Sequence, residues 1–227
     1  MINMDRGRVL EAFRVESEAL ARAMAGVSEG EWGLGTRCEP WTVRDLLAHV
    51  EIATSRVSDM LAAPAPDRAE VSAAGYYRPD HRFSPETDRV RVDAARADRR
   101  TGAVLAAEFA DTWRRVEEEC RAEPEGRVVR TRHGDSMLLT DFLVTRVVEV
   151  AVHGLDLADA LGHEPWLTPQ AGSVLRELLL GADGAEALRA LGWDKVGFVR
   201  RATGRAPLSD AEKEKLEGLG IQWLTLG

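Results

Sequence analysis

A glutamate and a histidine stand four residues apart inside the most apolar stretch of the sequence. Glu149 and His153 fall within FLVTRVVEVAVHGLDLADALG, residues 142–162, where apolar side chains cover most of the helical circumference. A helix that is apolar nearly all round is buried nearly all round. A buried carboxylate needs a compensating charge, and residues four apart share one face of a helix. Glu149 and His153 could therefore hold one metal ion from a single helix, as inward pairs do in helix bundles.

A second histidine repeats this pattern elsewhere in the chain. His49 lies in TVRDLLAHVEIATSRVSDML, residues 42–61, among leucine, valine and alanine. Two histidine nitrogens and one glutamate oxygen suit Zn²⁺, with a fourth position open to water or substrate. An open position is what metal-assisted catalysis requires. We therefore expect a divalent metal, zinc before Ni, Fe or Mn, which the same ligands would accept.

A metal-free alternative stays open on the residues alone. Arg146 lies three residues before Glu149 and could form an ion pair with it along the helix. His49 and His153 could be core histidines that donate to backbone carbonyl groups. Short motifs of this kind also match by chance. The metal prediction gains weight because two independent anomalies fall in two long predicted helices.

Helical periodicity organises the chain around these residues. Apolar spacing and caps predict helices over 5–27, 42–61, about 85–121 and 140–161. Thr42 and Asp45 resemble a capping box at the start of the second helix, Ser84 and Pro85 mark the start of the third, Thr140 or Asp141 is expected to cap the fourth, and Gly162 ends it. Residues 127–140 predict a short hairpin that turns near Gly134. We expect a mostly α protein, in which residues 1–163 form a four-helix bundle and 164–227 a small α/β appendage. Its expected strands are VGFVRRATG, residues 196–204, and IQWLTL, residues 221–226.

Composition and charge limit the classes of partner. The chain has 227 residues, 44% of them hydrophobic and 30% charged, and a formal net charge of −8. That charge argues against nucleic acid, which favours a basic surface. No apolar segment is long enough to span a membrane, and the N-terminus lacks an apolar signal core, so we expect a cytoplasmic protein. The two distant cysteines, Cys38 and Cys120, are expected to be free thiols.

Two stretches resemble a known family. EPWTVRDLLAHV, residues 39–50, is similar to the start of the second helix of the mycothiol-dependent maleylpyruvate isomerase N-terminal domain, in the DinB-like superfamily. TRVVEVAVHGLDLADALG, residues 145–162, resembles its fourth helix, where Glu-x-x-x-His supplies two metal ligands. The resemblance implies a DinB-like up-down four-helix bundle with His49, Glu149 and His153 as the metal ligands. It also implies an actinobacterial protein that uses mycothiol as co-substrate.

This resemblance suggests a reaction class. A metal would deprotonate a low-molecular-weight thiol and hold it beside an electrophile. We expect an enzyme that acts on a small electrophilic molecule by isomerisation or S-transfer, as a monomer or homodimer. Two alternatives remain: a non-catalytic metal- or ligand-binding stress protein, and a metal-free helical scaffold. The fold by itself does not fix the reaction.

Further residues are candidates for the same site. Asp156, three residues after His153, is expected to accept a hydrogen bond from that histidine, against the alternative of a helix-end charge interaction. Arg146 is a candidate substrate clamp or a partner of Glu149. Arg201 and Arg205 could contact the thiol or an anionic substrate. The remaining candidates are Cys38, for which no base is identifiable in the sequence, His133 in the predicted turn, and Tyr76, Tyr77 and His81 in the loop of residues 64–84.

Overall fold

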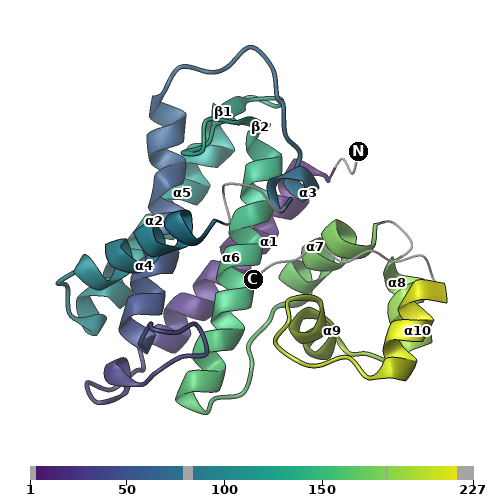
Figure 1. Cartoon of the computed structure of the whole chain (residues 1–227). Coiled ribbons are helices and arrows are strands. Elements are labelled where there is room, and N and C mark those ends of the chain that lie inside the picture. Colours follow the sequence, from purple (N-terminus) through teal and green to yellow (C-terminus); the bar gives the residue numbers. More distant parts are fainter. Residues whose placement is uncertain (1–3, 79–83, 182–183, 219–227) are drawn as a thin grey trace.

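The computed structural model describes residues 4–78, 84–181 and 184–218, and most of them are helical, as predicted (Figure 1). Four long helices correspond to the four expected ones, and the predicted third helix is interrupted just before Gly102. The long helices are α1 (Arg6–Met24), α2 (Val43–Ala62), α5 (Gly102–Ala122) and α6 (Leu139–Leu161).

These four helices form a bundle in which α1 and α2 each pack against both α5 and α6. Ser58 on α2 donates to Glu119 on α5, while Thr112 lies against Glu51 nearer the start of both helices, so α2 and α5 are parallel. The predicted four-helix bundle is therefore present. Its helices do not strictly alternate in direction, because α2 and α5 run parallel to each other. The reason is the crossover of residues 63–101, which returns the chain to the other end of the bundle before α5 begins.

Local sequence signals set the ends of the two helices that carry the site. Thr42 and Asp45 form the predicted capping box at the start of α2, with each side chain accepting from the other residue's backbone. At its far end α6 stops at Gly162, whose φ of 64° lies in the left-handed region that glycine tolerates. The prediction that Thr140 or Asp141 caps α6 was wrong. The helix begins directly after strand β2, with Leu138 at its N-cap and no side-chain cap.

The crossover and a hairpin cover the end of the bundle. The crossover contains α3 (Ala73–Tyr76) and α4 (Pro85–Ala97), and α4 packs against α2. Strands β1 (Val128–Arg130) and β2 (Ser136–Leu138) form the predicted antiparallel hairpin, with Val129 opposite Met137. Backbone amides of Glu70 and Val71 donate to the Ser136 carbonyl, which ties the crossover to the hairpin.

The C-terminal part lies beside α6 as a group of helices (Figure 1). It contains α7 (Pro169–Leu180), α8 (Gly184–Leu191), α9 (Lys195–Ala202) and α10 (Asp210–Gly218). The strand predicted at 196–204 was wrong, because Asp194 caps a helix there and Phe198 and Val199 bury one helical face. The strand predicted at 221–226 lies outside the described residues. Helix α7 packs against α1 and α6, and the division at residue 163 stays a prediction.

Within the described ranges, the structure contains no helix that combines the length and the hydropathy needed to cross a bilayer.

Candidate metal centre

His49, Glu149 and His153 converge where α2 crosses α6. His49 Nε2 lies 2.6 Å from Glu149 Oε1, and His153 Nε2 lies 3.5 Å from the same oxygen. The three donor atoms lie within 4.8 Å of one another. Neutral imidazole nitrogens and a carboxylate oxygen are the donors that divalent transition metals take in proteins. The residues present therefore fit a divalent metal ion.

A neighbouring side chain contacts and orients the ring of each histidine. The Trp41 ring stacks on the His49 ring at a centroid distance of 4.6 Å and an interplanar angle of 26°. His153 Nδ1 lies 3.0 Å from Asp156 Oδ2. An ionised carboxylate only accepts hydrogen bonds, so Nδ1 is the donor and Nε2 is the nitrogen that faces Glu149. Histidines that bind metal commonly have such a carboxylate partner; the hydrogen bond is present, and a role of Asp156 in a metal centre stays a prediction.

Asp156 is in turn clamped by an arginine from the C-terminal part. Arg205 Nε and Nη2 each donate to one oxygen of Asp156 at 2.7 Å, in a bidentate pair. The Asp156 side chain is fully buried, and only 9% of the Arg205 side chain is exposed. The loop after α9 therefore reaches the centre through a chain of contacts, from Arg205 to Asp156 to His153. Arg205 was predicted to contact thiol or substrate; its closest charged partner in the structure is Asp156.

Burial and hydrogen bonds together shift the pKa values of Glu149 and His153 in opposite directions. Burial favours neutral Glu149, but hydrogen bonds from His153 and His49 hold the pKa of Glu149 well below its ordinary value. Burial also favours neutral His153, but hydrogen bonds to Asp156 and Glu149 raise the pKa of His153 well above its ordinary value. Burial lowers the pKa of His49 despite Glu149. Without metal, the ionised form of Glu149 and the protonated form of His153 thus stabilise each other.

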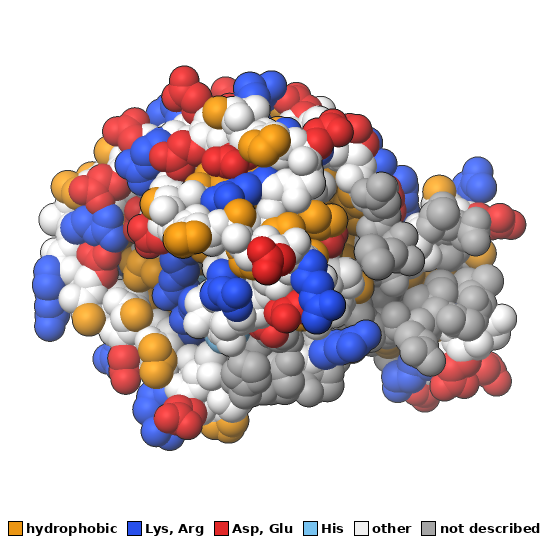
Figure 2. Space-filling model, turned by 90° about the horizontal axis from the view of Figure 1, so that it is seen from above, with side chains coloured by type: hydrophobic (Ala, Val, Ile, Leu, Met, Phe, Trp, Pro, Cys, Tyr) orange, Lys and Arg blue, Asp and Glu red, His pale blue; other side chains and the backbone are white. Residues whose placement is uncertain are grey.

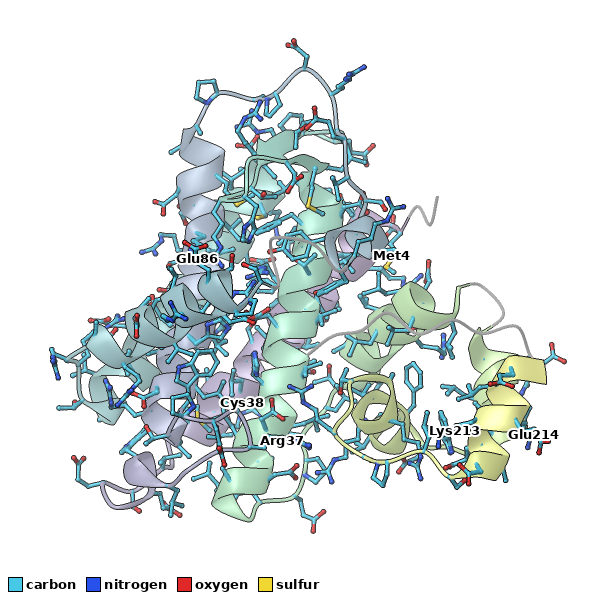
Figure 3. The ribbon with its side chains drawn as sticks, in the orientation of Figure 1. Met4, Arg37, Cys38, Glu86, Lys213 and Glu214 are labelled. Carbon is cyan, nitrogen blue, oxygen red and sulfur yellow. The ribbon has the colours of Figure 1, made fainter. Side chains whose placement is uncertain are left out.

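A second cluster of possible ligands adjoins the first. Cys38 Sγ lies 3.3 Å from Asp156 Oδ2 and 4.0 Å from His153 Nδ1. Figure 3 shows Arg37 and Cys38 on the loop between α1 and α2, next to α6. Because Arg205 already occupies both oxygens of Asp156, this cluster is a poorer cation site than the triad. No partner for Cys38 could be identified from the sequence, and the tertiary contact supplies one.

Arg146 joins the two helices behind the triad. Its Nη1 donates to the Ala53 carbonyl at 3.0 Å, and its Nη2 lies 3.9 Å from Glu149 Oε2. The guanidinium also stacks over the Phe142 ring, 4.8 Å from its centroid. The position of Arg146 is compatible with both expected roles. It approaches Glu149 as an ion-pair partner would, and it lines the cavity beside the triad, where it could contact a substrate.

The triad opens into a cavity of about 650 Å³. Ala53, Val148 and Val152 give it an apolar wall, and Cys38 and Arg205 line it with the triad. Tyr76 and Tyr77 also line it, so they belong to the pocket rather than to an exposed loop, and Tyr77 is buried. Its volume suits a small molecule.

Some candidates lie elsewhere, and some pocket residues were missed. Arg201 pairs with Glu212 at 3.1 Å and stacks on Trp193, away from the triad. His133 is half-buried near Tyr76 rather than solvent-exposed, and His81 lies outside the described residues. Arg56, Arg91 and Arg132 also line the cavity and were not predicted from the sequence. The signal for Arg56 was its place seven residues after His49, on the same face of α2.

The family comparison covers the part of the chain that carries this site. The model of the mycothiol maleylpyruvate isomerase N-terminal domain matches residues 13–158, which include all three residues of the triad. The chain belongs to that family. Curated relatives are two uncharacterised proteins from Mycobacterium tuberculosis strains, each 30% identical over 162 residues. The match covers 70% of this chain and 58% of each relative, so the chain spans little more than half of their length.

Solved structures show the same fold. A crystal structure of mycothiol-dependent maleylpyruvate isomerase has a TM-score of 0.58 at 18% identity, covering 89% of this chain and 90% of that one. A histidine-to-alanine variant of such an isomerase has a TM-score of 0.56 at 18% identity, covering 78% and 70%. These likenesses confirm the predicted DinB-like helical fold.

Proposed function

We propose that this protein is a metal-dependent enzyme that uses mycothiol for isomerisation of, or S-transfer to, a small electrophilic substrate. The observation that carries the proposal is the convergence of His49 Nε2, Glu149 Oε1 and His153 Nε2 in the lining of one cavity. Membership of the family supports mycothiol as the thiol, since its solved members are named as mycothiol-dependent isomerases. Zinc is the metal that the ligand types favour, with Ni, Fe and Mn as alternatives.

The residues of the chain would divide the work as follows. His49, Glu149 and His153 would hold the metal, Trp41 would fix the His49 ring, and Asp156 would orient His153. When bound, the metal would lower the pKa of a coordinated thiol, so that it is a thiolate at neutral pH.

The cavity would position the electrophile beside the thiol. Its apolar wall would reduce the contact of the reacting atoms with water, and addition of the thiolate to an activated double bond would allow rotation before the thiolate leaves again. Such an isomerisation needs no oxidant or reductant. Arg146 lies close enough to Glu149 to lend positive charge to this end of the cavity.

The first experiment measures metal content. Purified wild type, reconstituted with zinc, should hold a near-stoichiometric divalent ion by plasma mass spectrometry, and Glu149→Ala and His153→Ala should lose it. His163→Ala, the same substitution at an exposed histidine, is the control and should keep it. A folded wild type that binds no metal after reconstitution would overturn the metal centre, leaving the cluster as a hydrogen-bonded core feature.

Turnover decides between an enzyme and a binding protein. Metal-loaded wild type should convert an electrophile, maleylpyruvate first, only when mycothiol is present, and His49→Ala should abolish this activity. Tight metal binding without turnover on a broad panel of electrophiles would favour the alternative, a non-catalytic metal- or ligand-binding protein.

A further inference from the structure

Two arginines on the cavity wall take no part in the metal centre. Arg56 lies on α2, and Arg132 lies in the turn between β1 and β2. Both line the cavity of about 650 Å³ that contains the triad. Both also line a second cavity of about 390 Å³, together with Tyr76 and Arg146. The two cavities therefore share a wall at these arginines.

Arg56 and Arg132 have no carboxylate within ion-pair distance among the described residues, although Glu149 attracts Arg56 at longer range. Neither forms an ion pair with a carboxylate there, whereas the neighbouring Arg91 pairs with Asp88 at 2.5 Å. Arg132 Nε donates to His133 Nε2 at 3.1 Å. Burial, and then the charge of Arg146, lower the pKa of Arg56; burial and then the charge of Arg56 lower the pKa of Arg132 to about 10. Both groups stay protonated at neutral pH, so two cations share one concave site, which attracts an anion.

The second cavity offers a different surface beside these charges. Met60, Ala63 and Phe142 contribute apolar side chains to its lining. Met60 and Phe142 belong to the buried core, so this part of the lining is built on rigid elements, α2 and α6. A ligand that places an anionic group at Arg56 and Arg132 would find an apolar surface on one side and the metal triad on the other.

We propose that Arg56 and Arg132 form an anion subsite that selects an organic acid with an apolar substituent. The carboxylate lies between the two guanidinium groups, the apolar substituent lies against Met60, Ala63 and Phe142, and the remaining end points toward the triad. The role of the subsite in substrate choice rests on the proposed function. Its role as a binding site for an organic acid rests on the two cavities alone. Arg56 and Arg132 are then the residues that determine specificity, without touching the metal.

The test compares three small probes by isothermal titration calorimetry. Phenylacetate carries the anion and the apolar ring, phenylacetamide carries the ring without charge, and acetate carries the charge without the ring. Wild type should bind phenylacetate more tightly than either of the others, and added potassium chloride should reduce its preference over phenylacetamide. Arg56→Gln and Arg132→Gln should each weaken phenylacetate by about tenfold or more, because each removes a charged hydrogen bond, and should leave phenylacetamide unchanged.

Arg114→Gln is the matched control. Arg114 is an exposed arginine on α5 that pairs with Asp111, and its loss should leave all three probes unaffected. Equal affinity of wild type for phenylacetate and phenylacetamide at low salt would overturn the subsite, and this result does not depend on whether the variants fold. A preference for phenylacetate that persists in a folded protein carrying both Arg56→Gln and Arg132→Gln would overturn the subsite as well.

The subsite and the proposed function can fail separately. The titrations need neither metal nor mycothiol, so Glu149→Ala should keep the preference for phenylacetate. If no electrophile is turned over but this preference is found, the enzymatic proposal fails and the subsite stands. If mycothiol-dependent turnover is found but phenylacetate neither binds nor inhibits it, the subsite fails and the enzymatic proposal stands.

Discussion

Replacing Asp156 by asparagine tests whether the contacts behind His153 support the metal centre. Asp156 accepts from Arg205 on both oxygens and from His153 Nδ1 on one of them. Asparagine has the same shape but offers one acceptor oxygen and one NH₂ donor. In one orientation the NH₂ group opposes Arg205 Nε; in the other it opposes His153 Nδ1. No orientation of the amide reproduces all three hydrogen bonds, and the negative charge is lost in both.

Two magnitudes follow from burial. The Asp156 side chain is fully buried and Arg205 is 9% exposed, so the variant leaves a nearly buried guanidinium without its counter-ion. Breaking a buried pair in this way costs about 3–5 kcal/mol of unfolding free energy. Because asparagine keeps one acceptor, we expect about 3 kcal/mol, the lower end of that range. Zinc affinity should fall by about 10–100-fold, the usual effect of removing the carboxylate that orients a ligating histidine.

The assays are urea denaturation for stability and competition with a chromophoric chelator for zinc affinity. Asp159→Asn is the control, since Asp159 lies on the same helix and pairs with Arg200, with its side chain 38% exposed. Such a surface pair should change stability by no more than about 1 kcal/mol, and zinc affinity should not change. If Asp156→Asn behaves like Asp159→Asn in both assays, the chain of contacts from Arg205 through Asp156 to His153 does not support the site.

Two further predictions concern the framework. Burial raises the pKa of Glu16, which accepts from the Thr168 amide at 2.9 Å, so the stability linked to its protonated form is present below the ordinary pKa of 4.5 and is lost as pH rises through the folded pKa. Glu16→Gln should therefore gain stability relative to wild type as pH rises from acid to neutral in urea denaturation; a constant difference would contradict this. Gly102→Ala should cost about 1–3 kcal/mol in the same assay, because the added Cβ would overlap the Trp32 ring. Gly30→Ala meets nothing within 4 Å, so equal effects of the two substitutions would refute the packing argument.

The bundle could be predicted because its signals are local. The capping box at Thr42, the serine–proline start of α4 and the glycine end of α6 act through neighbouring residues, and all three are present. The strand predicted at 196–204 failed for the opposite reason. Its β-branched and aromatic residues favour a strand when taken alone, but Asp194 caps a helix whose apolar face packs against α7.

The candidate site could likewise be predicted from the sequence only in part. Glu149 and His153 could be paired from the sequence, because helical spacing fixes which side chains share a face. His49 could be proposed as a third ligand only from its apolar surroundings and the family resemblance. Cys38 could not be given a partner, since its contact with Asp156 joins residues 118 apart in the chain.

The sequence by itself determined the long helices of the bundle, the capping box of α2, the glycine end of α6 and the spacing that puts Glu149 and His153 on one face of α6. Those features depend on interactions within a few residues, which the order of amino acids specifies directly. The tertiary structure decided which side chains meet across elements: His49 with Glu149, Arg205 with Asp156, and Arg56 with Arg132 at the junction of two cavities. These contacts depend on how the crossover, the hairpin and the C-terminal helices pack on the bundle, and that packing is a property of the whole chain.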